Sequence, residues 1–245
     1  MTNKNIAEYK HTPQASIFSY EMSKIKNKSL FLFVMTVMIQ LSSFIFFSIV
    51  GKFDKSDDTI SSFQGIIALS NTVSMCAFAI IGSVLLRKEL VRFYIGEQRN
   101  RIFLFPVDRK ELLVKKTVSF QVMLLVSFGA GLIVSLLVAL MSNLFLNFDS
   151  SGLIDDLIIG LVSVLVSCLL VYIILLCSEI VAIQKQSEIA TVVSAVVFML
   201  LFSNLSAVGI MNAPFITLPI VILLSLLASA GFNAFATSIK KMEAY

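Results

Sequence analysis

The sequence predicts an all-α polytopic membrane protein with six transmembrane helices, on three observations. First, 58% of its 245 residues are apolar and the mean hydropathy is +0.93, whereas soluble domains are nearer half apolar. Second, charged residues make up only 14% of the chain and fall in short blocks between apolar runs of about twenty residues, the length of a membrane-crossing helix. Third, such runs have to be helical, because unpaired backbone groups are too costly in lipid.

The apolar runs define six spans within a single transmembrane domain, residues 1–245. The last two are the hardest to delimit, because the only strong breaks between them are Ser203-Asn204 and Asn212-Ala213-Pro214. These breaks leave a very short connection, with either two full spans or one half-span that dips back into the membrane. The expected spans are Leu30–Val50, Phe63–Leu86, Val118–Asn143, Leu157–Cys177, Ile189–Gly209 and Ile216–Phe235.

The basic residues are divided unequally between the two sides of the predicted membrane. Seventeen of the 19 lysines and arginines fall on one side, and the other side has only Lys52 and Lys55. By the positive-inside rule, both termini are cytoplasmic in a multi-pass protein of the cell membrane. This partition also explains the net charge of +4 without any nucleic-acid partner.

The cytoplasmic N-terminal segment, residues 1–29, is expected to contain a short amphipathic helix over residues 12–28. Phe18, Met22 and Ile25 recur at helical spacing, and Lys24 to Lys28 form a basic cluster before the first span. Such a helix lies in the headgroup plane with its apolar face on the lipid. The alternative is an ordinary juxtamembrane tail that is basic for topological reasons alone.

The connection between the second and third spans, residues 87–117, carries nine basic and four acidic residues. It also holds two apolar triplets, Phe93-Tyr94-Ile95 and Phe103-Leu104-Phe105, which need cover from the bundle or from a partner protein. Pro106 ends any preceding helix, and Asp108 with Glu111 forms a capping box.

A helix that starts at Asp108 runs without a break to about Asn143. Its roughly 35 residues span about 52 Å, much more than the bilayer thickness. The second and third spans are therefore expected to extend into the cytoplasm as a hairpin, with residues 97–105 across its tip. A partner that moves this tip would move two membrane helices. The alternative is a solvated basic loop.

Several function classes are disfavoured by what the predicted spans lack. No charged residue lies near the centre of a span, because Glu179 and Glu188 are placed at a boundary, and ion-driven carriers usually need such residues. The one histidine is His11, and no phosphate-binding loop occurs. We therefore expect no catalytic residue, metal site or cofactor in this chain.

The polar residues within the spans are uncharged. Gln40, Asn71 and Asn204 are candidates for a substrate cleft, although such residues more often hydrogen-bond between packed helices. Small residues at four-residue spacing, Ser127, Gly131 and Ser135, allow two helices to approach closely.

Two segments carry a resemblance to a known family. Tyr20–Lys28 precedes the first span, and Glu97-Gln98-Arg99-Asn100-Arg101-Ile102-Phe103-Leu104-Phe105-Pro106-Val107-Asp108-Arg109-Lys110-Glu111-Leu112-Leu113 follows the second. With the six-span layout, they resemble ABC-2-type transporter permease subunits. That family typically has Gly-Thr where this chain has Asn100-Arg101. In this motif the chain more closely resembles the small permeases of the bacteriocin-immunity and antimicrobial-peptide export subgroup.

The resemblance implies a membrane subunit of an ATP-driven exporter for an amphipathic or peptide-like substrate. Two permeases, identical or sister chains, would pair with two copies of a separate ABC ATPase that binds the ATP. The substrate path would lie between the permeases, lined by the first, second and fifth spans. Residues 97–105 would be the coupling helix, with Phe103 and Phe105 as apolar anchors. The implied interface comprises Glu97, Arg99, Arg101, Phe103, Leu104, Phe105, Pro106, Asp108 and Arg109. The rival class is a non-transport scaffold or sensor subunit that uses the same loop to bind a cytoplasmic partner.

Overall fold

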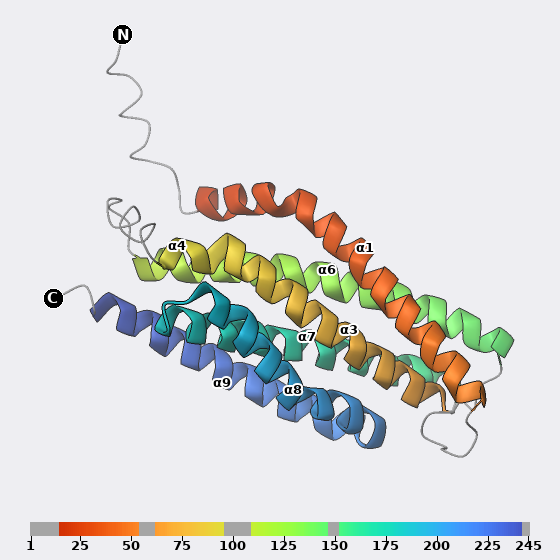
Figure 1. The fold of residues 1–245 in the computed structure, drawn as a ribbon. Helices are drawn as coiled ribbons and strands as arrows, with labels where there is room; N and C mark the ends of the chain where they lie inside the picture. The colour runs from red at the N-terminus through yellow and green to blue at the C-terminus, as the bar shows by residue number, and fades with distance from the viewer. Residues whose placement is uncertain (1–14, 54–61, 96–108, 147–151, 242–245) are drawn as a thin grey trace, which may run out of the picture.

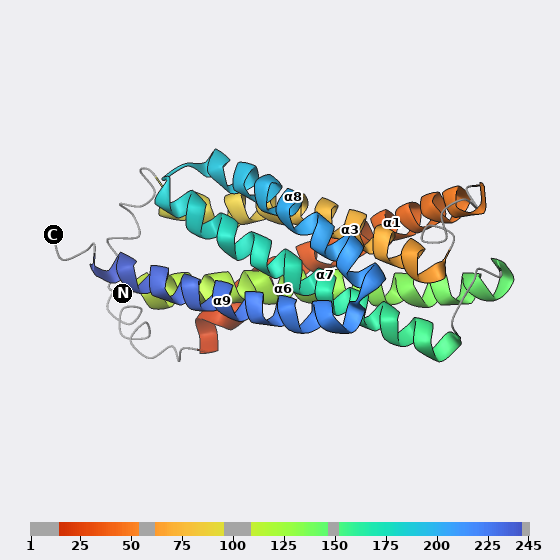
Figure 2. The ribbon, with the colours of Figure 1, turned by 90° about the horizontal axis from the view of Figure 1, so that it is seen from below.

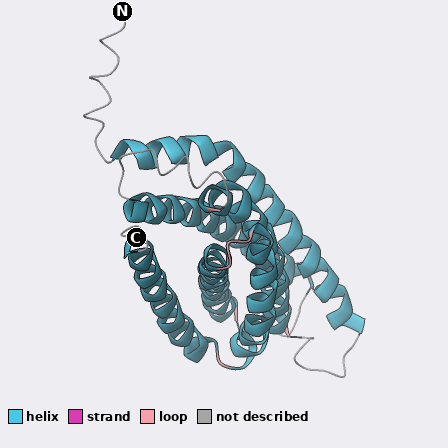
Figure 3. Ribbon diagram, turned by 60° about the vertical axis from the view of Figure 1, so that its left-hand side comes forward, coloured by secondary structure: helices cyan, strands magenta, loops and turns pink. Residues whose placement is uncertain are grey.

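The computed structural model describes residues 15–53, 62–95, 109–146 and 152–241, and this part of the chain is helical nearly throughout (Figure 1, Figure 3). Six of its helices are long and apolar enough to cross a membrane, which confirms the all-α, multi-pass fold. The elements are α1 (Ala15–Phe53), α3 (Phe63–Leu86), the π-helix η2 (Arg87–Val91), α4 (Arg92–Tyr94), α6 (Arg109–Leu146), α7 (Leu153–Gln184), α8 (Glu188–Asn212) and α9 (Pro214–Lys241).

The helices form one elongated bundle around α7, which contacts α3, α6, α8 and α9. Helix α1 packs on α6 and α3 along one side (Figure 1). At one end of the bundle α1 begins, α4 and α6 flank residues 96–108, and α9 ends (Figure 2). We call this the basic end, because Lys28, Arg87, Lys116 and Lys185 lie in the segments there. The opposite end, where α1 ends and α7 begins, is the far end.

Close packing of aromatic rings and methyl groups holds the interior of the bundle. The rings of Phe78 and Phe128 stack with centroids 4.4 Å apart, and both side chains are fully buried. Lipid tails are as apolar as leucine, so such contacts and interhelical hydrogen bonds, rather than the hydrophobic effect, hold helices together in a membrane.

The expected N-terminal helix and the first span form one continuous helix, α1. Its first turns run in a different direction from the remainder, so the ribbon bends before it enters the bundle (Figure 1). Phe18, Met22 and Ile25 lie on these first turns, where only the backbone is described. The placement of this segment in the headgroup plane stays a prediction.

The second and third spans extend beyond their expected limits, as the hairpin prediction requires. The first leg continues from α3 through η2 and α4 to Tyr94, and α6 runs for 38 residues from Arg109 to Leu146. The unbroken helix predicted after Pro106 is thereby confirmed from Arg109 onward. Asp108, its expected cap, lies outside the described residues.

The last two spans are two full helices rather than one helix and a half-span. Helix α8 has 25 residues and α9 has 28, with only Ala213 between them. Pro214 takes the first position of α9, where its missing N–H costs nothing. The turn between them stops short of the far end that α1 and α6 reach (Figure 1, Figure 2).

Helix α7 runs on past Cys177, where the fourth span was expected to end, and the placement of Glu179 at a membrane boundary stays a prediction. Helix α7 continues to Gln184, and the Glu179 side chain is completely buried within it. The apolar run does stop near Cys177 in the sequence, but Thr117 of α6 donates a hydrogen bond of 2.6 Å to Glu179 Oε1. A tertiary contact therefore keeps the acid inside the bundle.

Candidate functional site

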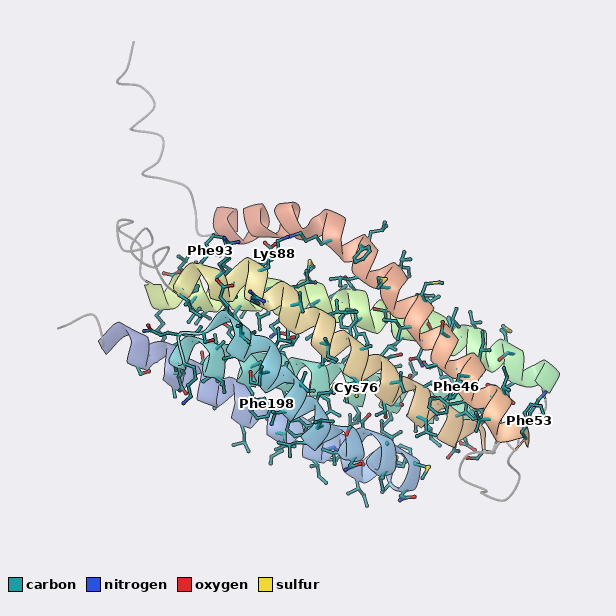
Figure 4. The ribbon with its side chains drawn as sticks, in the orientation of Figure 1. Phe46, Phe53, Cys76, Lys88, Phe93 and Phe198 are labelled. Carbon is teal, nitrogen blue, oxygen red and sulfur yellow. The ribbon has the colours of Figure 1, made fainter. Side chains whose placement is uncertain are left out.

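Two helical legs flank residues 96–108 at the basic end. The first leg is Arg87–Tyr94, and the second is the start of α6. The Lys116 ammonium of the second leg lies 4.0 Å from the centroid of the Phe93 ring of the first, a distance typical of a cation–π contact. Figure 4 shows Phe93 and Lys88 at this end of the bundle. The legs are therefore joined to each other before the chain enters the segment between them.

The first apolar triplet of the connection is covered by the bundle. Phe93, Tyr94 and Ile95 are half-buried, and the last two pack against the main core. The second triplet, Phe103-Leu104-Phe105, lies outside the described residues together with Glu97, Arg99, Arg101, Pro106 and Asp108. Arg109 is the first residue of α6, and its side chain is not described. The expected partner interface is thus bounded by the two legs, and its own residues remain a prediction.

The first leg contains a π-turn that no feature of the sequence predicted. In η2 the Arg92 N–H bonds to the Arg87 carbonyl oxygen, five residues back. Such turns insert one extra residue into a helix and occur frequently at functional sites.

Two ion pairs tie this π-turn to neighbouring helices. Lys28 of α1 pairs with Glu89, and Arg87 Nε lies 3.1 Å from Oε2 of Glu188, at the start of α8. All four side chains are partly exposed, so each pair contributes at most about 1 kcal/mol. The two pairs connect the first leg to α1 and to α8.

A buried polar network joins α1, α3 and α7 inside the bundle. Gln40 Nε2 donates to Asn71 Oδ1 at 2.5 Å, and Ser74 donates to Gln40 Oε1 at 2.5 Å. Asn71 Nδ2 donates to Ser163 Oγ at 2.6 Å. Gln40 is 5% exposed and Asn71 2%. Two of the three residues expected in a cleft thus meet and fasten three helices in this conformation.

The third expected residue, Asn204, does not join them. It lies exposed on α8, and α8 is linked to the network's helix instead through Ser206, whose hydroxyl lies 2.9 Å from that of Thr72.

An open apolar groove of about 560 Å³ runs beside this network along α1. Met35, Met38 and Phe46 line it, and Val73 of α3 forms its other wall. Figure 4 shows Phe46 on the outer part of α1. Methionine side chains adapt to ligands of irregular shape, so this groove suits a bulky apolar molecule. This groove could not be predicted from the sequence, because its lining residues are not distinguished from the other apolar residues of the run Leu30–Val50.

A family model described as ABC-2 family transporter protein matches residues 17–204, which is more than half of the chain. No curated protein and no solved structure matches it.

Proposed function

This chain belongs to the ABC-2 family of transporter proteins, and on that premise we propose that it is the membrane-spanning subunit of an ATP-driven exporter whose ATPase is a separate chain. It is a multi-pass transport subunit with six membrane-crossing helices. The binding and hydrolysis of ATP are assigned to the partner.

The basic end of the bundle is proposed to face the cytoplasm. Lysine and arginine are concentrated there, and the positive-inside rule governs short connections of this kind. Both termini then lie on the cytoplasmic side of the cell membrane, where an ATPase reaches residues 96–108.

The pair of joined legs is the observation that carries the proposal. They continue two membrane helices past the apolar spans and lead into residues 97–105, which would dock on the ATPase with Phe103 and Phe105 as anchors. Closure of two ATPase copies on ATP would displace the tip. Packed helices shift as rigid bodies between discrete arrangements, so the displacement would reach α3 and α6 directly, and α1 and α8 through the ion pairs of η2.

The proposed substrate is an amphipathic or peptide-like molecule, such as an antimicrobial peptide. The apolar groove on α1 supports this choice, because it suits the apolar face of such a molecule. Asp155 lies exposed in the first turn of α7 at the far end, where a carboxylate attracts cationic substrates. The path is proposed to form against a second permease copy or a sister permease, across α1, α3 and α8.

Replacing Phe103 and Phe105 together by aspartate is expected to abolish co-purification of the partner ABC ATPase. Two charges in an apolar groove of the partner would be buried without counterions, which is strongly unfavourable. The measurement is the amount of ATPase retained on tagged, detergent-solubilised permease.

Gln186→Asp is the matched control. Gln186 lies exposed in the other connection of the basic end, with φ 48°, a conformation that aspartate tolerates. This variant should retain the ATPase. A complex that survives both Phe→Asp changes would remove the docking role of Phe103 and Phe105.

A further inference from the structure

A second cavity, distinct from the groove on α1, lies between α6, α7 and α9 near the basic end. Its volume is about 220 Å³, smaller than the roughly 300–1,000 Å³ of pockets that enclose a whole drug-sized ligand. Helices α6 and α9 lie side by side there (Figure 2). Val118 and Val122, which line the cavity, are also exposed on the outer face of α6. The cavity is therefore reached from the lipid and admits one chain or head group.

One polar side chain in its lining is buried without partners. Gln121 is 2% exposed, and neither its Nε2 nor its Oε1 has a hydrogen-bond partner among the described residues. A buried unpartnered amide costs about 1–3 kcal/mol, so its presence in a native bundle calls for a ligand. A primary amide has both a donor and an acceptor to satisfy, which requires a ligand that offers both.

The opposite wall of the cavity offers a further acceptor. The Ser229 hydroxyl donates to the Ser225 carbonyl oxygen at 2.7 Å, so the Tyr172 hydroxyl, 2.9 Å from Ser229 Oγ, must be the donor in that pair. The Tyr172 oxygen then keeps an accepting lone pair, and Tyr172 lines the cavity. A ligand hydroxyl satisfies this acceptor, and a ligand ester carbonyl satisfies the amide nitrogen of Gln121.

The depth of the cavity matches the backbone of a glycerolipid. Lys115 and Lys116 mark the headgroup level on α6, and Gln121 lies five residues beyond Lys116, about 7.5 Å along the helix. The headgroup layer of each leaflet is about 5–7 Å thick. Gln121 is thus level with the ester linkages, and the apolar side chains of Val122 and Leu125 continue into the hydrocarbon.

We propose that this cavity binds a hydroxyl-bearing anionic glycerophospholipid of the adjacent leaflet, with its glycerol region at Gln121 and one acyl chain between α6 and α9. Phosphatidylglycerol has this chemistry, and basic ends of helix bundles attract anionic head groups. Phosphatidylcholine has no donor for the Gln121 oxygen or for Tyr172. This inference concerns a lipid site and does not depend on the transport role.

The absence of tryptophan from the sequence makes a direct test available. Phe232→Trp places a single reporter in the cavity wall, and Phe198→Trp is the control on α8. Figure 4 shows Phe198 on α8, which does not contribute to the cavity.

Each variant is reconstituted in phosphatidylcholine vesicles containing increasing fractions of phosphatidylglycerol with brominated chains, which quench tryptophan on contact. Quenching at position 232 should be half-complete at a mole fraction about five-fold lower than at position 198, the ratio given by about 1 kcal/mol of net hydrogen bonding. Adding Gln121→Leu should abolish that difference, and brominated phosphatidylcholine should show none.

Equal quenching at the two positions would overturn the proposal, and this comparison needs no change at Gln121. A difference that persists unchanged in the Gln121→Leu protein would also overturn it, because the amide would then not hold the lipid. Gel filtration of each variant before reconstitution shows that the compared proteins are folded.

Discussion

Replacing Gly131 by leucine is expected to be strongly destabilising, because α1 and α6 touch at this glycine. A Cβ atom added there would lie 2.7 Å from Cβ and 2.8 Å from Cγ2 of Thr36, and 3.3 Å from the Phe33 carbonyl oxygen. Threonine is branched at Cβ and cannot rotate out of the way, so the helices must separate. Overpacking of this kind costs about 1–3 kcal/mol or more, and Tm in detergent should fall by several degrees.

Gly231→Leu is the matched control for this effect. Gly231 lies on the exposed face of α9, and a Cβ added there meets nothing within 4 Å. The same substitution should leave Tm unchanged or raise it slightly, since glycine is a poor residue in a helix interior. Equal Tm values for the two variants would mean that α1 and α6 are not in contact at Gly131.

Thr117→Val is expected to destabilise the bundle through Glu179. Thr117 donates the one hydrogen bond that reaches this completely buried carboxyl group from the described residues. Valine has nearly the same shape but no hydroxyl, so the acid would remain buried without that donor. The cost of an unsatisfied buried polar group is about 1–3 kcal/mol. Thermal unfolding of the purified variant measures it.

The double variant Thr117→Val with Glu179→Met separates this cause from a simple packing defect. With the acid removed, no buried group lacks its hydrogen-bond donor when Thr117 is replaced by valine. Replacing both members of a buried polar pair is often nearly neutral. The double variant should therefore be more stable than Thr117→Val alone. If Thr117→Val costs as much in the Glu179→Met background as in the native one, the hydrogen bond is not the source of its effect.

The parts of the fold that follow from helix length could be predicted from the sequence. The uninterrupted run after Pro106 required a helix longer than the bilayer, and α6 has that length. The small residues Ser127, Gly131 and Ser135 predicted a close helix contact, and the partner is α1. Ser127 Oγ lies 2.7 Å from Ser29 Oγ, and Gly131 packs on Thr36. The periodicity showed which face of the helix carries small residues, but not which helix packs against that face.

Features that depend on contacts between distant residues could not be predicted. Glu179 interrupts an apolar run, so the span was ended before it, and only its hydrogen bond with Thr117 explains its burial. The π-turn η2 has no sequence signature, and Gln121 is one polar residue among many until its lack of partners is known. Of the expected cleft residues, Gln40 and Asn71 meet, but Asn204 faces outward. This difference could not be predicted, because composition does not show how a helix is rotated in the bundle.

The decisive claim is that ATP closes an attached ATPase and thereby moves the first leg relative to the remainder of the bundle. Spin labels on Arg92→Cys and Gly231→Cys, both exposed positions, report the distance between this leg and α9, in a protein whose native Cys76, Cys168 and Cys177 are replaced by alanine. With the ATPase bound, the mean distance from pulsed electron paramagnetic resonance should change by more than about 2 Å when ATP and vanadate are added. It should not change when the permease is alone. The same distance distribution with and without trapped nucleotide in the intact complex would contradict the account.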